Sequence, residues 1–142
     1  MKLKDVLTQK PSGVFTIEAS NSLQTAIKEM YDKRIGALVV QSATGESVGI
    51  LTDRDVLYFH AKQSADANKV SVSEVMSKEV FVETLDSTTD KAESIMTEKR
   101  VRHLPIVDKG NIVGLISIGD LVKAKLEETA VEVKYLRDYI SS

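Results

Sequence analysis

An internal duplication dominates this sequence. Residues 14–40 align without gaps with residues 80–106 at a constant offset of 66 positions, and 7 of the 27 aligned pairs are identical. Chance would give about one or two identities for ordinary composition. The identical pairs are Val14/Val80, Phe15/Phe81, Ala26/Ala92, Met30/Met96, Lys33/Lys99, Arg34/Arg100 and Leu38/Leu104. A period near 65 residues is too long for a solenoid repeat and too short for two independent domains, so we expect two similar halves that share one core.

The duplication continues on both sides of this block. After one loop residue is omitted, residues 45–52 align with 110–117 and Asp55 aligns with Asp120, at an offset of 65. Upstream the offset is 69, which leaves three extra residues in the first copy around Pro11-Ser12-Gly13; the matched pairs there are Leu3/Val72, Val6/Val75 and Leu7/Met76. We therefore divide the chain into repeat 1 over residues 1–68, repeat 2 over residues 69–124 and a C-terminal helical extension over residues 125–142.

The pattern within one half predicts strand, helix, strand, strand and helix. Apolar residues recur at helical spacing from Leu23 to Met30 after a polar capping segment, and short β-rich runs flank turn-forming residues. In the first half the predicted elements are a strand over 14–17, a helix from residue 23 that Gly36 ends, a hairpin of strands over 37–40 and 48–51, and a helix over 55–62 capped by Thr52 or Asp53.

The C-terminal residues 119–142 contain no proline and have the pattern of one long helix. Apolar or small residues there alternate in steps of four and three, at Val122, Leu126, Thr129, Val133, Leu136 and Ile140. Such spacing is typical of a packed helix seam. A helix of this length spans roughly 36 Å, which exceeds what one small core covers. We favour a helix that helps to join two subunits, and a helix lying along its own subunit is the alternative.

Composition and charge exclude several classes of function. The 19 Lys plus Arg and 21 Asp plus Glu give a formal net charge of −2, so no general attraction to nucleic acid or to an anionic membrane is predicted. The absence of cysteine excludes disulfides, thiolate metal sites and cysteine nucleophiles. His60 and His103 are the only histidines and lack ligand spacing, so we predict no metal site. No targeting signal is apparent and no apolar run approaches the roughly 18 residues that cross a bilayer, so we expect a cytoplasmic protein.

The most informative motif lies at a predicted strand-to-helix junction in each half. Residues 49–55 and 114–120 both read glycine, two aliphatic residues, a hydroxyl residue, two variable residues and aspartate. A helix start offers N–H groups and partial positive charge that suit phosphate, and an aspartate in the first turn accepts hydrogen bonds from both hydroxyls of a ribose. The motif indicates a nucleotide cradle. The same residue types are ordinary helix caps, and spacing alone leaves both interpretations open.

Two duplicated groups have a structural and a functional interpretation. The basic pairs at residues 33–34 and 99–100 end the first helix of each half, where cations oppose the negative helix terminus. We favour this structural role over contact with phosphate. For Phe15 and Phe81 we favour core packing over stacking on adenine.

An enzymatic role would rest on Ser117, Asp120 and His103, which superficially provide a nucleophile, an acid and a base. A serine nucleophile needs histidine as its immediate partner and aspartate behind the histidine. Here the serine and the aspartate share a helix start, and the first copy repeats that pair without a histidine. We therefore predict that the chain is not an enzyme.

The paired junction motifs, together with Arg102-His103-Leu104-Pro105-Ile106-Val107 before the second hairpin, resemble the tandem CBS domain family, named after cystathionine β-synthase. The likeness covers essentially the whole chain. The ending Ser117-Ile118-Gly119-Asp120-Leu121-Val122, with the long helix that closes in Tyr139-Ile140, further resembles stand-alone bacterial CBS-pair proteins. It implies an α+β fold of two β-α-β-β-α repeats packed into one pseudo-two-fold module, and usually a homodimer. It also implies a regulatory module that binds an adenosine ligand such as AMP, ADP, ATP, NAD or S-adenosylmethionine, requires no other cofactor, and signals to an effector protein by changing conformation.

The resemblance also implies two ligand clefts, each built from both repeats. One cleft would use Ser117 and Asp120 on the ribose, Arg102 and His103 on the phosphates, and Val14, Ile35, Gly36 and Ala37 around the adenine. The other would use Thr52, Arg54 and Asp55 with Val80, Val101 and the backbone near His103. Because Gly36-Ala37 replaces the cationic pair in the first copy, we rank the Asp120 cleft as the better site. A ligand-independent scaffold for dimerisation or protein interaction is the alternative function.

Overall fold

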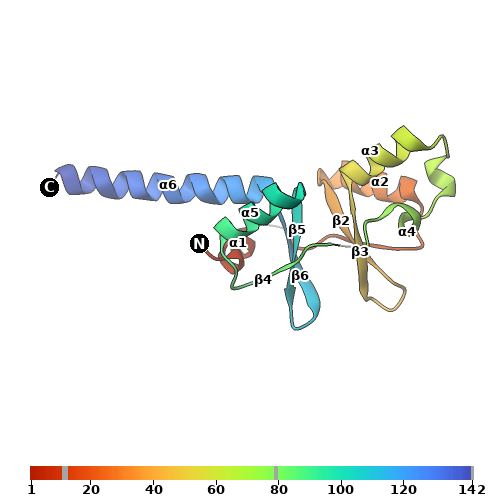
Figure 1. The fold of residues 1–142 in the computed structure, drawn as a ribbon, viewed down its shortest axis with the longest axis horizontal. Coiled ribbons are helices and arrows are strands. Elements are labelled where there is room, and N and C mark those ends of the chain that lie inside the picture. Colours follow the sequence, from red (N-terminus) through yellow and green to blue (C-terminus); the bar gives the residue numbers. More distant parts are fainter. Residues whose placement is uncertain (11–12, 79, 142) are drawn as a thin grey trace. The chain divides into compact units, whose positions relative to one another are not determined.

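The computed structural model describes residues 1–10, 13–78 and 80–141 (Figure 1). The chain divides into two compact units: unit 1 combines residues 1–11 with residues 82–142, and unit 2 contains residues 12–81. Each unit is a three-stranded sheet with helices packed around it, which confirms the predicted α+β fold of two tandem repeats. The extra loop expected around Pro11-Ser12-Gly13 lies outside the described residues except for its glycine.

Unit 2 carries the first copy of the duplicated pattern. Its elements are β1 (Thr16–Glu18), α2 (Leu23–Lys33), β2 (Ala37–Gln41), β3 (Ser47–Thr52), α3 (Asp53–Lys62), the short 3₁₀ helix η1 (Ala67–Lys69) and α4 (Val72–Val75). β2 lies at the centre of the sheet, parallel to β1 and antiparallel to β3. The predicted hairpin and both predicted helices are confirmed, and Thr52 is the cap of α3.

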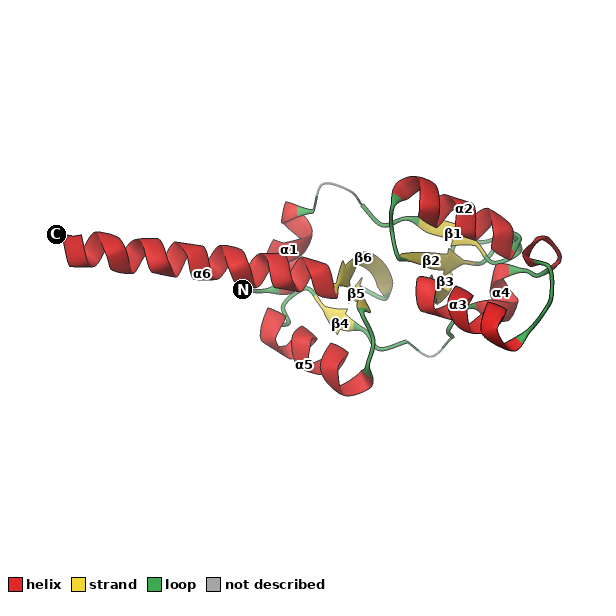
Figure 2. Ribbon diagram, turned by 90° about the horizontal axis from the view of Figure 1, so that it is seen from above, coloured by secondary structure: helices red, strands yellow, loops and turns green. Residues whose placement is uncertain are grey.

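Unit 1 carries the second copy. Its elements are α1 (Leu3–Gln9), β4 (Glu83–Thr84), α5 (Thr89–Lys99), β5 (His103–Asp108), β6 (Asn111–Ser117) and α6 (Ile118–Ser141). β5 lies between β4, to which it is parallel, and β6, to which it is antiparallel. Figure 2 shows the helices of each unit around their own sheet, and α6 continuing past the rest of unit 1. The long C-terminal helix predicted from residue 119 is confirmed through Ser141.

Among the described residues, each unit has a cluster of buried apolar side chains. In unit 2 the fully buried residues of the predicted helical face pack with the two long strands and with Phe59. In unit 1 the equivalent cluster is built around Leu104, Ile106 and Ile116. Each sheet therefore buries one apolar face under the helices of its own unit, and the expectation of a core shared by the two halves stays a prediction.

The segment that leads into each repeat packs in the other repeat's unit. Lys2, before α1, pairs with Thr88 at the start of α5, and the Leu3 N–H donates to the Ser87 carbonyl at 2.8 Å. In unit 2 the same arrangement joins Ser71, before α4, to Ser22. The sequence repeats and the compact units therefore have different boundaries. α1, which leads into the first copy, belongs to unit 1, and α4, which leads into the second copy, belongs to unit 2.

The first helix of each half ends at its basic pair, as expected, and in the first half this is before Gly36, the predicted terminator. α2 stops at Lys33 and α5 at Lys99, and the following residues, Arg34 and Arg100, both adopt the left-handed conformation with φ of 55°. Gly36 is not the terminator. The duplicated basic pair therefore marks a helix C-cap, a position that more often holds glycine. The ammonium of Lys33 also lies 4.9 Å from the centre of the Phe15 ring.

The two phenylalanines differ in burial. Phe15 packs against the core of unit 2, as predicted. Phe81 is 45% exposed, so the expectation of core packing was wrong for the second copy.

The glycines of the junction motif permit close packing of the exchanged segments. A Cβ on Gly49 would lie 2.6 Å from the Ser77 carbonyl oxygen, and a Cβ on Gly114 would lie 2.5 Å from a methyl group of Leu7. Gly49 is therefore required by the backbone of the segment after α4, whereas the neighbour of Gly114 is the end of a side chain in α1. Across the part of the chain that the structure describes, no helix combines the length and apolar character needed to span a membrane.

Candidate functional site at two strand-to-helix junctions

Ser117 and Asp120 form a reciprocal cap where β6 runs into α6. The Ser117 N–H donates to Oδ2 of Asp120 at 2.9 Å, and the Asp120 N–H donates to Oγ of Ser117 at 3.1 Å. This is a capping box, in which two backbone donors at the helix start are satisfied by each other's side chains. The capping role expected of these residue types is therefore confirmed, and it holds the carboxylate in a defined orientation.

A lysine from the N-terminal segment contacts the same carboxylate. Nζ of Lys10 lies 2.9 Å from Oδ2 of Asp120 and also donates to the Leu115 carbonyl at 2.8 Å. The two side chains are 27% and 22% exposed. Burial raises the pKa of Asp120, but the Ser117 hydrogen bonds and the Lys10 ammonium outweigh burial and leave the pKa below its usual value. Asp120 is therefore an anion at neutral pH.

The lowered pKa of Asp120 predicts acid-dependent stability. A carboxylate whose pKa is lower in the folded state stabilises the fold above its unfolded pKa of about 4, and this contribution disappears as the pH falls through the folded value. At pH 7 we expect Asp120→Asn to be about 1–2 kcal/mol less stable than the wild type. Urea unfolding from pH 7 to about pH 2 should show this difference constant above about pH 4 and shrinking below it. A constant difference across that range would show that the charge of Asp120 does not stabilise the fold.

Unit 2 repeats the capping box with a different third partner. The Thr52 N–H donates to Oδ2 of Asp55 at 2.9 Å, and the Asp55 N–H donates to Oγ1 of Thr52 at 3.2 Å. The Ser77 hydroxyl donates to Oδ1 of Asp55 at 3.0 Å, and the Ser77 N–H donates to the Ile50 carbonyl at 2.8 Å. Ser77 therefore takes the place in unit 2 that Lys10 takes in unit 1.

The two carboxylates differ in the oxygen atoms they have left for a ligand. Both oxygens of Asp55 accept hydrogen bonds, from Thr52 and from Ser77. The contacts made to Asp120 by the described residues fall on Oδ2. Oδ1 of Asp120 is therefore the acceptor available at the junction of unit 1, beside an ammonium group that supplies positive charge.

Other predicted residues adjoin each junction. In unit 1 the Ile118 N–H donates to the Arg102 carbonyl at 2.9 Å, and His103 lies opposite Ser117 in the β5–β6 register. In unit 2 the Asp53 N–H donates to the Gly36 carbonyl at 2.9 Å, and Ala37 lies opposite Thr52. The structure thus groups Arg102, His103, Ser117 and Asp120 in unit 1, and Gly36, Ala37, Thr52, Arg54 and Asp55 in unit 2.

The remaining predicted contacts divide between the units. Val14, Ile35 and Val80 belong to unit 2, and Val101 belongs to unit 1. Ile35 and Val101 are partly buried against the cores of their own units. Clefts that combine residues of both units, as the family resemblance implies, stay a prediction.

Sequence reasoning missed Lys10 and Ser77 as partners of the two aspartates. At the upstream offset of 69, Ser77 aligns with Thr8, and not with Lys10. Thr8 lies within α1 and donates to the Lys4 carbonyl at 2.8 Å, whereas Ser77 follows the end of the shorter α4. The two leading helices differ in length, so alignment cannot pair the residues that reach the carboxylates.

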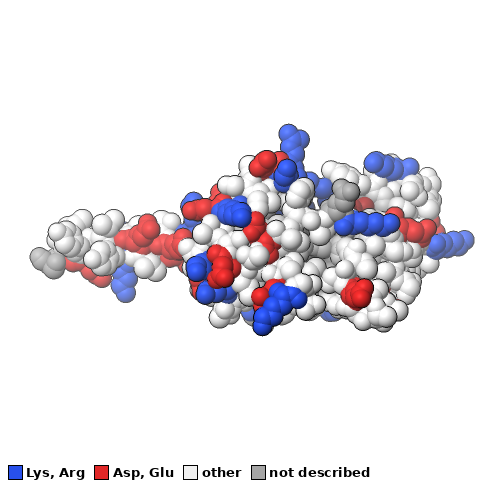
Figure 3. All heavy atoms as spheres, turned by 60° about the horizontal axis from the view of Figure 1, so that its bottom comes forward, with Lys and Arg blue, Asp and Glu red and all other residues white. Residues whose placement is uncertain are grey.

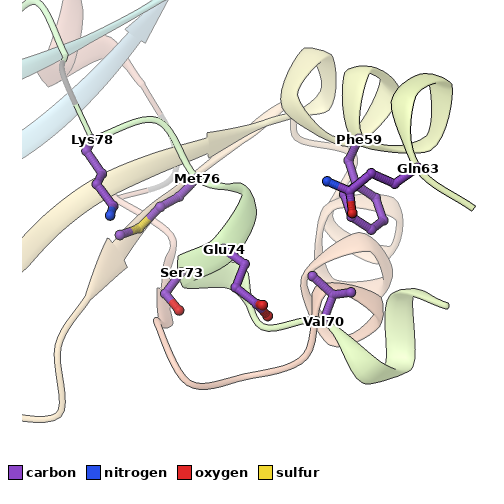
Figure 4. A pocket seen from close by; sticks show the side chains of 7 residues that line it. All are labelled: Phe59, Gln63, Val70, Ser73, Glu74, Met76 and Lys78. Carbon is purple, nitrogen blue, oxygen red and sulfur yellow. The ribbon is translucent and has the colours of Figure 1, made fainter. Parts of the chain in front are cut away.

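Unit 2 also contains an open hollow of about 660 Å³ near α4 (Figure 4). It is lined by Phe59, Gln63, Val70, Ser73, Glu74, Met76 and Lys78. Glu74 there accepts a hydrogen bond from the Ser71 N–H at 2.7 Å, so its carboxylate caps α4. The hollow contains none of the predicted ligand residues. Within the described ranges, no group of three or more His, Cys, Asp or Glu side chains has an arrangement suited to a metal ion.

Comparison with known proteins assigns the family. The CBS domain family model matches residues 3–62 and 72–127. The chain belongs to the CBS domain family. The CBS domain-containing protein YhcV of Bacillus subtilis is 34% identical over 119 residues, covering 84% of this chain and 81% of YhcV.

Two further relatives support this assignment. The mitochondrial CBS domain-containing protein CBSX3 of Arabidopsis thaliana is 32% identical over 124 residues; the match covers 84% of this chain and 60% of the relative's length. The crystal structure of the CBS-domain protein ATU1752 from Agrobacterium tumefaciens is 40% identical, with a TM-score of 0.83 and coverage of 87% of this chain and 92% of that one. Pairs of CBS domains are generally regulatory modules.

Proposed function

We propose that this CBS pair is a cytoplasmic, non-enzymatic sensor that works as a homodimer and binds an adenine nucleotide of the AMP, ATP or NAD type. The observation that carries the proposal is the state of Asp120. Its carboxylate is ionised, oriented by the Ser117 N–H and by Lys10, and retains Oδ1 as an acceptor. Charge-assisted hydrogen bonds from the two hydroxyls of a ribose are the contacts for which such a carboxylate is suited.

The surroundings of Asp120 support a phosphorylated ligand. Arg102 and His103 adjoin the same helix start, and α6 adds the positive end of its dipole. In unit 2 the equivalent positions are Gly36 and Ala37. We therefore propose the Asp120 junction as the principal nucleotide site.

Lys10 offers a route from the site to the rest of unit 1. A ligand shifts a conformational equilibrium only by binding two states with different affinity. Because Lys10 joins Asp120 to the segment that follows α1, a ribose bound at Asp120 would favour one position of that segment over another. We propose that the effector protein detects this change.

Thermal-shift measurements and isothermal titration test the proposal. The panel is AMP, ADP, ATP, NAD and S-adenosylmethionine, with inosine monophosphate as a control for the adenine base. At 100 times its dissociation constant, a bound nucleotide should stabilise the protein by about 2.7 kcal/mol. Absence of both a thermal shift and binding heat across the adenine panel would contradict the proposal.

The second candidate function is a ligand-independent scaffold for dimerisation or protein interaction. The distal part of α6 favours it, because large apolar residues such as Leu136 and Ile140 are 57% and 81% exposed there. A scaffold predicts thermal stability and oligomeric state that do not respond to nucleotide. The same panel therefore separates the two functions.

A further inference from the structure

We propose that the distal parts of α6 from two copies of this chain pack side by side, parallel and in register, through Leu126, Thr129, Val133, Leu136 and Ile140. This seam is distinct from the nucleotide site and does not depend on it. Three features of α6 support it: the small part that unit 1 covers, the apolar stripe on the remainder, and the charges beside that stripe.

Only the first turns of α6 pack within unit 1. Leu121 and Ala124 are the buried residues of this helix, and Glu128 forms an ion pair with the Met1 ammonium at 3.2 Å. From Thr129 to Ser141 every residue is exposed. Figure 1 shows this part of the helix continuing past α1 and α5. The alternative that α6 lies along its own subunit therefore fails for its distal half.

The exposed half of α6 carries a continuous apolar stripe. Leu126, Val133, Leu136 and Ile140 are between 40% and 81% exposed. In the face shown in Figure 3, much of the distal helix surface belongs to residues other than Lys, Arg, Asp and Glu. An amphipathic helix gains most of its stability by packing its apolar stripe. The alternating steps of four and three match the seam of a two-helix coil, in which one copy supplies the same stripe to the other.

The charges that flank the seam select the parallel orientation. In the seven-residue repeat of a coiled coil, lettered a to g, the seam consists of the a and d positions. The a positions here are Leu126, Val133 and Ile140, and the d positions are Thr129 and Leu136. Glu132 is then at a g position and Arg137 at the e position that follows it. In a parallel pair each g residue faces the e residue five positions later on the other helix, so two Glu132–Arg137 ion pairs form across the seam.

Repulsion between like charges disfavours an antiparallel pair of helices that brings the same seam residues into contact. It brings Glu132 of the two helices together, and it places Lys123 beside Arg137 of the other copy. Like charges at such positions are destabilising. A second copy in parallel orientation is therefore the occupant that fits this helix.

Sedimentation equilibrium of the full-length chain without nucleotide tests the seam. At roughly 10–200 µM, a range that brackets micromolar dissociation constants, we expect the wild type to form dimers and Leu136→Glu to shift at least about tenfold toward monomer. Tyr135→Glu is the matched control, because Tyr135 is 71% exposed but lies outside the seam, and it should associate like the wild type. Neither side chain is buried in unit 1, so both variants should fold. A monomeric wild type, or equal effects of the two substitutions, would overturn the proposal and would favour a partner of another kind.

Oxidative cross-linking tests the orientation. The chain has no cysteine, so a single Leu136→Cys substitution introduces one thiol per copy. A parallel, in-register seam places the two introduced thiols opposite each other, and we expect a disulfide-linked dimer on a non-reducing gel. A cross-link that forms only when Leu126→Cys and Leu136→Cys chains are mixed would show an antiparallel pair and contradict the proposal. Neither result alters the nucleotide titrations, so the proposed seam and the proposed nucleotide site fail separately.

Discussion

Replacing Asp120 with alanine should lower the affinity for the adenine nucleotide by about 30-fold or more, whereas Asp55→Ala should lower it by less than about threefold. The proposed ligand loses two charge-assisted hydrogen bonds to Asp120, each worth about 1.5–3 kcal/mol, and tenfold in affinity corresponds to about 1.4 kcal/mol. Asp55 already uses both oxygens within unit 2. Isothermal titration of both variants with AMP measures the difference.

The two substitutions control for each other. Each removes one half of a capping box with the same geometry, so each should cost about 1–2 kcal/mol of stability. Any difference in nucleotide affinity then comes from the ligand contact and not from the helix start. If Asp55→Ala weakens binding more than Asp120→Ala, our ranking of the two junctions is wrong.

Replacing Gly49 with alanine should destabilise unit 2 by about 2–3 kcal/mol, a cost typical of overpacking in a well-packed site. The new Cβ would lie 2.6 Å from the backbone carbonyl of Ser77, which is itself held by paired hydrogen bonds to Ile50. Neither backbone can move without breaking that pairing. The effect is opposite to the usual gain of about 0.5–1 kcal/mol when alanine replaces glycine in a strand.

Gly114→Ala is the matched variant in unit 1 and should cost about 1 kcal/mol or less. Its Cβ would meet the methyl groups of Leu7 at 2.5 and 2.6 Å, and these lie at the end of a side chain that has other rotamers. Urea unfolding followed by circular dichroism compares the two variants. Equal costs, or a stabilised Gly49→Ala, would show that the exchanged segment after α4 does not restrict β3.

Local patterns predicted the central elements of each half well. The run from Ala37 and the run ending at Leu51 form the expected hairpin, because β-branched side chains and the turn residues between them encode strands through nearest neighbours. The helical spacing from Leu23 to Met30 likewise gave the buried face of α2. The duplication transferred these predictions to the second copy, where α5 spans the residues offset by 66 from α2.

Contacts between distant segments were not predictable in this way. The upstream offset matched Leu3 to Val72, but matching residues cannot tell which unit each leading helix joins, and the structure exchanges them. The same limit applies to Lys10, whose contact with Asp120 joins residues 110 positions apart in sequence. The end of α2 before Gly36 depends on Arg34 in a left-handed conformation, for which propensity favours glycine.

The central claim is that Asp120 binds the two hydroxyls of a ribose. Titration of the wild-type chain with AMP and with 2′,3′-dideoxy-AMP tests it most directly, since the two ligands share the base and the phosphate. We expect AMP to bind and the dideoxy nucleotide to bind at least about 30-fold more weakly, with Asp120→Ala removing most of the difference. Equal affinity of the wild type for both nucleotides would contradict the claim.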